Sequence, residues 1–391
     1  MTTFFHFQNR TIFILSPEAW GIMRISKHHY AVELARMGNR VYFFEPPELG
    51  QDIRGSITQT PEGVHVVRYQ PLARGRRFLG RRLVSWLQAI QLRTRILKAT
   101  GRPDVVWCFD MGTFDDLSVF GAGLSIFHPV DHNLERRAPP VARKADFVFS
   151  TSPRILAYMK GAAQRGMVVQ HGLNRNMEAY ARAERERIST LQETPTFRGT
   201  IGFWGSLFKE SLDNRKILRL IEAFPNYIFT FWGAFDPRDS NLTGKVDRES
   251  KDFIARLRST PNVRLPGARS AAEFCQEIGE VDLFINVEFE YSLRWDNGNP
   301  HKIMEYLATG KPIFSTPVLM YAGQGMLFES NGEDVAADLR RLLSEWEHWS
   351  GIPERKRRID YALSNTYRQQ VARIESYISQ TPVPASPPPT P

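Results

Sequence analysis

Two charged residues three positions apart, Lys302 and Glu305, form the most informative pair in the sequence. Pro300 precedes them and Gly310 follows, which predicts a helix that begins near the proline and ends at the glycine. The first turn of a helix offers unpaired N–H groups and a positive dipole end, which suit a diphosphate. Lys302 would add a full charge there, and Glu305 could accept both hydroxyls of a ribose. An ordinary surface Lys–Glu pair has the same spacing, so this pattern alone leaves both interpretations open.

Alternating strands and helices must position this pair. Continuous apolar runs, such as 11–16 and 200–204, predict strands of parallel sheets covered on both faces. The alternation runs through two halves of similar size, which predicts an α/β protein with two Rossmann-like, doubly wound domains facing a central cleft. Ligands of such sheets bind at the carboxyl ends of the strands, so the loops that follow the strands are the candidate binding elements.

Changes of pattern along the chain set the expected boundaries. Residues 1–174 are predicted to form the N-terminal domain and 198–355 the C-terminal domain. The polar, helical segment 175–197 is predicted to connect them. Residues 356–380 are expected to form a C-terminal helix that packs back on the N-terminal domain. The Pro/Ser/Thr-rich tail, 381–391, cannot build a core and is expected to be disordered.

Composition restricts the class of protein. The chain has 391 residues, of which 42% are hydrophobic and 24% charged, and no window approaches the ~20 apolar residues needed to span a bilayer. Its two cysteines, Cys108 and Cys275, lack neighbours at ligand spacing, so they predict neither a disulfide framework nor a zinc site. The start of the chain has no pattern of a signal peptide, so we expect a cytoplasmic protein.

Positive charge is concentrated in one segment. Residues 68–102 contain ten Lys and Arg residues and no Asp or Glu, whereas the whole chain has a net charge of +9, which leaves the remainder near −1. Within this segment, 76–98 has a helical apolar stripe. We expect peripheral contact with an anionic membrane, where each Lys or Arg adds ~1 kcal/mol of attraction. A core-packed helix with a basic exposed side is the alternative.

The stretch 299–312, Asn-Pro-His-Lys-Ile-Met-Glu-Tyr-Leu-Ala-Thr-Gly-Lys-Pro, resembles a signature of the GT-B fold glycosyltransferases. This form is typical of the family 4-like group (group 1), and within it of bacterial polysaccharide transferases of the teichuronic-acid type. The resemblance extends over most of the chain. Further similar segments are 17–24, 26–35, 41–47, 145–153, 170–174 and 262–267.

The resemblance implies a function and a donor site. The protein would move a sugar from a nucleotide-sugar donor to a saccharide or lipid-linked saccharide acceptor, in bacterial surface polysaccharide biosynthesis. The first domain would bind the acceptor and the second the donor. Glu305 would then bind the ribose and Lys302 the diphosphate, while Asn299 and Pro300 shape the loop. Leu265 would lie in a turn that holds the nucleotide base through backbone groups.

Other candidates lie in loops after predicted strands. In the second half, Gly205 would permit a close approach and Lys209 would supply a cation, with Arg294 as a second candidate cation. In the first half, Gly21 would let the backbone approach the donor, and Asp131 could act as general base on an acceptor hydroxyl or bind the sugar. A plain turn at Gly21 and a solvated charge at Lys209 are the alternatives.

The candidate catalytic residues are therefore Asp131, Lys302 and Glu305. Many relatives have an acidic residue eight positions before the ribose-binding glutamate, but this chain has Asn297 there, which weakens any claim for a second acidic contact to the donor sugar. No Asp-x-Asp motif stands in a suitable place. We therefore expect no metal and no cofactor besides the nucleotide-sugar co-substrate, with cations and the helix N-terminus neutralising the leaving diphosphate.

Two other functions stay open. A nucleotide-sugar epimerase can have the same two-domain fold. A non-enzymatic nucleic-acid-binding protein could use the Arg-rich segment, although no aromatic stacking platform accompanies it and no nucleic-acid partner is expected. A nicotinamide oxidoreductase is disfavoured, because 16–21, after the first predicted strand, lacks the Gly-x-Gly-x-x-Gly pattern.

Overall fold

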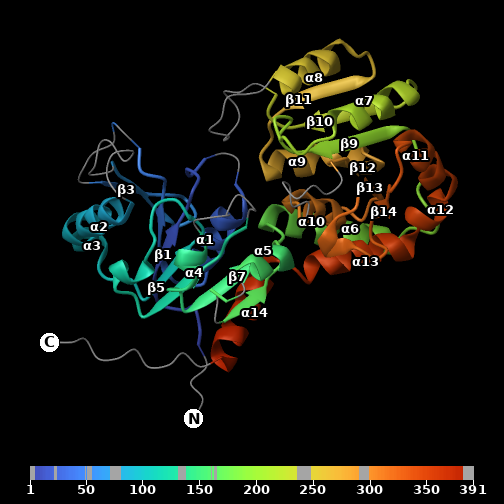
Figure 1. Ribbon diagram of the computed structural model, residues 1–391. Coiled ribbons are helices and arrows are strands. Elements are labelled where there is room, and N and C mark those ends of the chain that lie inside the picture. Colours follow the sequence, from blue (N-terminus) through green and yellow to red (C-terminus); the bar gives the residue numbers. More distant parts are fainter. Residues whose placement is uncertain are drawn as a thin grey trace. The chain divides into compact units, whose positions relative to one another are not determined.

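The computed structural model describes residues 5–21, 24–48, 50, 55–70, 81–130, 138–159, 161–162, 165–235, 248–289 and 299–381, with the side chains at 81, 82, 85, 88, 89, 93 and 95 left out. The chain divides into two compact units (Figure 1). Unit 1 comprises Met1–Gln170 and Tyr367–Pro391, and unit 2 comprises His171–Thr366.

Unit 1 contains an eight-stranded sheet. Its strands are β1 (Thr11–Leu15), β2 (Arg40–Phe44), β3 (Ser56–Gln59), β4 (His65–Arg68), β5 (Val105–Cys108), β6 (Leu124–Phe127), β7 (Phe147–Ser150) and β8 (Gly166–Val168). They lie in the order β3-β4-β2-β1-β5-β6-β7-β8, and only the edge pair β3–β4 is antiparallel. The central strands are short apolar runs buried on both faces, as parallel strands require.

Helices cover both faces of this sheet. They are α1 (Ser26–Arg36), α2 (Arg81–Gln91), α3 (Leu97–Thr100), α4 (Ala138–Ala142), α5 (Pro153–Tyr158) and α14 (Tyr367–Gln380), with a π-helical turn at Leu92–Ile96 and a 3-10 turn at Leu117–Phe120. One hydrophobic cluster joins the sheet to α1 and α14, and a second joins it to α4, α5 and the two turns. The unit is therefore doubly wound.

Unit 2 repeats this plan with six strands. These are β9 (Thr200–Trp204), β10 (Ile228–Trp232), β11 (Val263–Gly267), β12 (Leu283–Asn286), β13 (Ile313–Ser315) and β14 (Phe328–Glu329). Their order is β11-β10-β9-β12-β13-β14, and every neighbouring pair is parallel. The helices are α6 (Arg175–Ser189), α7 (Asn214–Ala223), α8 (Arg248–Ser259), α9 (Ala271–Glu277), α10 (His301–Ala308), α11 (Val335–Ser344), α12 (Trp346–Trp349) and α13 (Ile352–Leu363).

The two faces of the second sheet have separate cores. Side chains of α7, α8 and α11 form one cluster with the strands, and those of α6, α9, α10 and α13 form the other. The predicted α/β fold with two doubly wound sheets is thus confirmed. Among the helices that the structure describes, none is long and apolar enough to cross a membrane.

The segment predicted to connect the domains is instead part of unit 2. Residues 175–189 form α6, whose first N–H groups are capped by Asn174: its Oδ1 accepts from the Met177 N–H at 3.0 Å. Met177, Ala181 and Ile188 are fully buried in the core that α6 shares with α10 and α13. The segment looked like a linker because a covering helix buries one apolar stripe and leaves its other faces charged.

The predicted C-terminal helix, 356–380, is two helices that belong to different units. α13 ends at Leu363 in unit 2, and α14 begins at Tyr367 and packs against α1 in unit 1. Between them, the Asn365 side chain donates to the Tyr361 carbonyl, and the Asn365 carbonyl accepts from the Leu173 N–H. These contacts replace helical hydrogen bonds and end α13. Residues 382–391 of the predicted tail lie outside the described residues.

Candidate functional site

The helix predicted around the Lys302–Glu305 pair is present with the expected ends. α10 follows Pro300, which is its N-cap residue with φ −64° and ψ 126°. It ends at Ala308 with Thr309 as its C-cap residue, and Gly310 has φ 68°, a conformation that favours glycine. A Cβ on Gly310 would also lie 2.9 Å from Ile359 Cδ1 and 3.0 Å from a backbone oxygen of α13. Local turn chemistry and close packing therefore both require glycine here.

Lys302 lies in the first turn of α10 and is 9% exposed. Its Nζ lies 3.0 Å from Glu288 Oε1 and 4.5 Å from the centre of the Phe203 ring. Lys209, in the loop after β9, contacts the same carboxylate, with its Nζ 2.8 Å from Oε1 and 2.9 Å from Oε2. Lys302 is thus paired with Glu288 rather than Glu305, which makes the surface-pair interpretation wrong. Lys209 is likewise paired and not simply solvated.

Glu288, just after β12, is 1% exposed and stands at the centre of this cluster. Its Oε2 accepts a hydrogen bond from Ser211 Oγ at 2.8 Å. Burial raises the pKa of Glu288, but the attraction of Lys209 and Lys302 outweighs burial and holds the pKa at about 2. Burial lowers the pKa of Lys302 to about 8 against the opposing effect of Glu288. Glu288 and Lys302 are therefore both charged at neutral pH, and Lys209 places a second ammonium group against the same carboxylate.

Glu288 is the residue that the sequence analysis missed. It is separated by 79 positions from Lys209, so no local spacing links the two. A signal was nevertheless present, because a glutamate directly after the apolar run 283–287 stands at the carboxyl end of a predicted buried strand. An acidic residue in that position could have been tested as a partner for the basic residues of neighbouring loops.

Glu305 lies one turn further along α10 and is 6% exposed. Its Oε1 accepts a hydrogen bond from Asn174 Nδ2 at 2.9 Å. The same oxygen lies 3.6 Å from Nδ1 of His301, a pair that is ionic only when the histidine is protonated. The His301 ring in turn packs edge-on against His171, with centroids 5.1 Å apart. The carboxylate is therefore held in place by the first residues of unit 2.

Gly205 brings the loop after β9 close to α10. Its φ of 154° is rare for other residues, its N–H donates to the Trp232 carbonyl at 2.8 Å, and an added Cβ would stand 3.8 Å from Lys302 Cδ. Gly233 is equally constrained, because a Cβ there would be 1.8 Å from the Gly205 oxygen. Trp204, the last residue of β9, donates its N–H to the Tyr306 hydroxyl at 2.7 Å, which ties the strand to α10.

The structure therefore brings together the loop of Gly205 and Lys209 with the start of α10. Asn299 and Pro300 lie immediately before that helix, and the Pro300 carbonyl accepts from the Ile303 N–H at 3.1 Å. Leu265 lies elsewhere, on the edge strand β11, two strands away from β9. The segment 262–267, which resembles a base-holding turn, contains this strand, which pairs in parallel with β10 through an irregular register.

The remaining predicted residues lie in unit 1 or outside the described residues. Gly21 is half-buried in the loop between β1 and α1 of unit 1. Asp131 and Arg294 lie outside the described residues, as do Asn297 and the basic residues of 71–80. In the part of the chain that the structure describes, no group of three or more His, Cys, Asp or Glu side chains is arranged to hold a metal ion.

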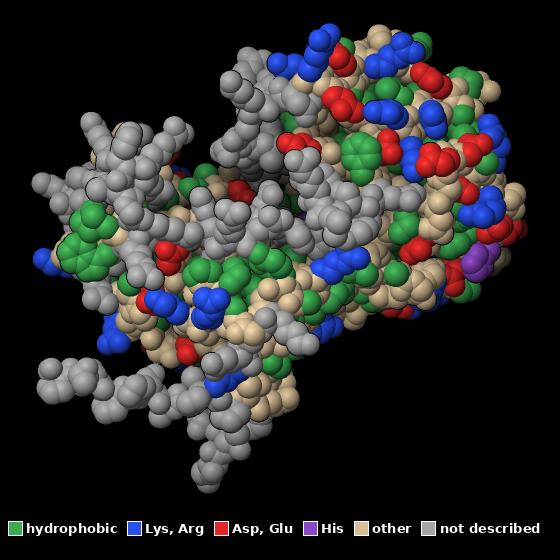
Figure 2. All heavy atoms as spheres, viewed as in Figure 1, with side chains coloured by type: hydrophobic (Ala, Val, Ile, Leu, Met, Phe, Trp, Pro, Cys, Tyr) green, Lys and Arg blue, Asp and Glu red, His purple; other side chains and the backbone are tan. Residues whose placement is uncertain are grey.

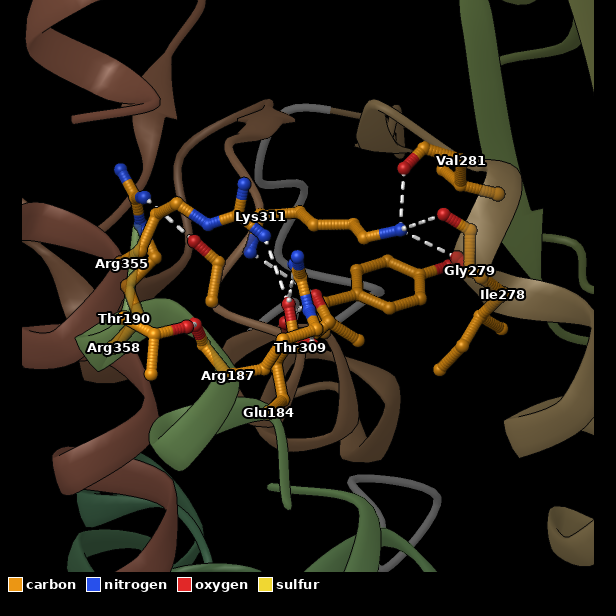
Figure 3. Close-up of polar contacts among 12 residues, drawn as sticks. Glu184, Arg187, Thr190, Ile278, Gly279, Val281, Thr309, Lys311, Arg355 and Arg358 are labelled. Atoms are coloured by element: carbon orange, nitrogen blue, oxygen red, sulfur yellow. Dashed lines mark hydrogen bonds and ion pairs between the residues drawn. The ribbon is translucent and has the colours of Figure 1, made fainter. Parts of the chain in front are cut away.

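A second buried lysine, Lys311, follows α10 but serves a different purpose. Its Nζ donates to the backbone carbonyls of Ile278, Gly279 and Val281, at the end of the segment that follows α9 (Figure 3). Burial lowers the pKa of Lys311 to about 7. Since all three acceptors are main-chain oxygens, this lysine ties elements together, whereas Lys302 and Lys209 meet at a side-chain carboxylate.

No protein-family model and no curated protein sequence matches the chain. Solved structures do. Sucrose-phosphate synthase from Thermosynechococcus elongatus is similar at 12% identity and a TM-score of 0.60, over 95% of this chain and 98% of that one. Anabaena HepE, in complex with UDP and glucose, is similar at 13% identity and 0.62, over 95% and 100%. An α,α-trehalose-phosphate synthase (UDP-forming) from Burkholderia vietnamiensis reaches 0.65 at 10% identity, over 97% and 98%.

At these identities the likeness shows the fold alone. It extends over both α/β units, and the fold is that of the GT-B glycosyltransferases. The resemblance drawn from 299–312 thus agrees with the structure at the level of the fold.

Proposed function

We propose that the chain is a glycosyltransferase that takes a sugar from a nucleotide-sugar donor bound by unit 2. The observation that carries the proposal is the convergence of Lys209 and Lys302 at the first turn of α10, with one carboxylate between two ammonium groups. An excess positive charge beside the N-terminus of a helix suits a diphosphate and can stabilise it as a leaving group. Glu305, one turn on, would accept the ribose hydroxyls.

Uridine diphosphate is the first nucleotide to test. The HepE structure contains UDP and glucose, and the similar trehalose-phosphate synthase is described as UDP-forming. We propose a saccharide or lipid-linked saccharide as acceptor, in the synthesis of a surface polysaccharide. The sucrose-phosphate and trehalose-phosphate synthases favour a second candidate, a free sugar phosphate as acceptor.

A peripheral membrane location fits the lipid-linked acceptor. α2 exposes Leu83 (45%) and Trp86 (58%), and a small hydrophobic patch is visible at the left edge of Figure 2, where this helix lies. The surrounding segment 68–102 carries ten basic residues and no acidic one. Exposed apolar side chains within a basic segment suit the surface of an anionic bilayer. We therefore propose a cytoplasmic protein that contacts the inner face of the plasma membrane.

Thermal shifts with UDP, GDP, TDP and CMP test the donor site. A ligand at about 100 times its Kd adds ~2.7 kcal/mol of stability, which raises the melting temperature measurably. We expect a shift with at least one nucleoside diphosphate and none with the Lys302→Ala variant. The absence of a shift with all four nucleotides would contradict the proposal. Transfer of labelled sugar to an acceptor then separates a transferase from an epimerase, which would bind the nucleotide without transfer.

Co-sedimentation with liposomes of increasing phosphatidylglycerol content tests the membrane contact. The Arg76, Arg77, Arg81 and Arg82→Gln variant should bind less than wild type, and salt should weaken the binding of both proteins. A matched variant with Arg248, Arg256, Arg258 and Arg340 changed to Gln loses the same charge from exposed positions of unit 2. Equal binding by all three proteins would end the membrane proposal and leave the transferase proposal intact.

A further inference from the structure

The Lys209–Glu288–Lys302 cluster contains one residue with no part in the donor contacts proposed above. Lys209 comes from the loop after β9, Lys302 from α10, and Glu288 from the segment just after β12. Both ammonium groups contact Glu288 Oε1, at 2.8 and 3.0 Å. Two like charges that share one oxygen repel each other and depend on the anion between them. Without that anion, each lysine would be driven away from the position that it holds.

We infer that Glu288 is the positioning residue of the donor site: its carboxylate holds Lys209 and Lys302 at one point, where a nucleoside diphosphate can engage both. This inference rests on the proposed function. Glu288 itself is fixed, because its Oε2 accepts from Ser211 and its N–H lies 3.1 Å from the Thr316 hydroxyl oxygen. Lys209 is the partner that solvent reaches, since its side chain is 45% exposed, against 10% for Lys302. An incoming anion would therefore meet Lys209 first.

Glu288 also controls the charge of Lys302. The charged groups that act on Lys302 from other elements are Glu288, which raises its pKa, and Lys209, which lowers it; burial lowers it further. The Phe203 ring of β9 faces the same ammonium, and His301 and Glu305 lie on its own helix and contact each other. Removal of Glu288 leaves burial and Lys209, both of which favour the neutral amine. Removal of Lys209 has the opposite effect.

The two removals therefore predict opposite shifts in the pH dependence of binding. In the wild type Lys302 is charged below about pH 8, so affinity for a diphosphate is present there and declines as the pH rises through that value. In Glu288→Gln the decline should move to lower pH by about one unit or more. In Lys209→Gln it should move to higher pH, although the overall affinity is lower because one cation is lost.

The experiment is calorimetric titration with UDP, or with whichever of GDP, TDP and CMP the wild type binds, across the pH range 6 to 9. Glu288→Asp, which keeps the charge, should restore most of the wild-type midpoint. The matched control is Glu184→Gln, which removes another buried carboxylate of unit 2 that pairs with two cations, Arg187 and Arg355. A purely structural role for Glu288 predicts that Glu288→Gln and Glu184→Gln alter stability alone and leave the midpoint of binding unchanged.

The outcomes separate the two proposals. If the wild type binds none of the four nucleotides, the proposed function is wrong and the inference falls with it. If the wild type binds and Glu288→Gln keeps its pH midpoint, only the inference is overturned. If Glu288→Gln does not fold, the Lys209→Gln variant is measured instead, because Lys209 is exposed. A pH midpoint of binding that stays or moves to lower pH in this variant overturns the inference, and a move to higher pH supports it.

Discussion

Unit 1 and unit 2 each contain a doubly wound sheet, but the polar side chains that they bury differ in charge. In unit 1, His128 directly follows β6 and is 0% exposed, and burial lowers its pKa to about 3. His28 of α1 is equally buried, and its pKa is lowered to about 4, again mainly by burial. Both histidines are therefore neutral at pH 7. In unit 2, Glu288 follows β12 and is charged, as is Lys302 beside it.

The surroundings explain the difference. His128 is packed among Trp107, Phe109 and Tyr30, and its Nδ1 accepts from the Trp107 indole N–H at 3.3 Å. An aromatic environment offers no counter-charge, so the neutral ring is favoured. Glu288 has two ammonium groups within 3.0 Å. Buried charge is costly unless it is paired, and the two ammonium groups beside Glu288 meet that condition.

The largest expected effect is the loss of nucleotide binding on removal of the unit 2 charges. Lys302→Ala or Glu305→Ala should weaken UDP binding roughly 10- to 150-fold, since a charge-assisted contact contributes ~1.5–3 kcal/mol. Titration calorimetry measures the effect, and Lys251→Ala, an exposed lysine on α8, is the control. Wild-type affinity in both site variants would show that the charged cluster of unit 2 is structural, and the contrast with unit 1 would lose its functional meaning.

A second test uses the neutral histidine of unit 1. The folded pKa of His128, about 3, lies below the unfolded value of 6.5, so the unfolded state binds the proton first and stability falls as the pH drops below 6.5. At pH 5 the loss from this residue should be about 2 kcal/mol relative to pH 7. In His128→Phe that part of the acid sensitivity should disappear. Urea unfolding at both pH values measures it.

The exposed His348→Phe serves as control for that experiment, since its side chain lies on the surface of unit 2. If wild type and His128→Phe lost the same stability between pH 7 and pH 5, His128 would not be held in its neutral form in the folded protein.

Lys311 gives a smaller effect of the same direction, in a window at higher pH. Its folded pKa, about 7, lies below the unfolded value of 10.5, so the unfolded state binds more protons between them and stability rises with pH in that window. Between pH 7 and pH 8 the gain should be about 1 kcal/mol. Lys311→Met should lower stability overall, because three carbonyls lose their donor, and should flatten this rise.

Unfolding by urea at the two pH values, with Lys251→Met as the exposed control, measures the slope. A variant as steep as the wild type would indicate that Lys311 is fully charged in the folded protein throughout this range.

The smallest expected effect concerns metal. If the cations of unit 2 neutralise the leaving diphosphate, chelation should change nothing. Sugar transfer should then proceed at the same rate with and without EDTA. A full loss of turnover, restored by Mg²⁺ or Mn²⁺, would show that the charged cluster of unit 2 is not sufficient.

Much of the structure around Lys302 could be predicted, because its signals are local. Pro300 and Gly310 mark the two ends of α10, because proline favours a helix start and glycine favours the left-handed conformation after a helix end. The connector prediction over 175–197 was wrong for the opposite reason. The sequence of a polar helical segment does not show which surface the helix will cover. The assignment of α6 to unit 2 follows from the packing of Met177, Ala181 and Ile188 against α10 and α13.

The sequence by itself determined the α/β class, the repeat of the doubly wound plan and the ends of α10, since apolar periodicity and helix caps act over a few residues. Only the tertiary structure decided which charges meet. β9 and β12 are neighbours in the sheet, although 78 residues lie between Trp204 at the end of β9 and Leu283 at the start of β12. That strand order brings Lys209 to Glu288 and turns Lys302 toward both, because parallel neighbours end at the same edge of a sheet.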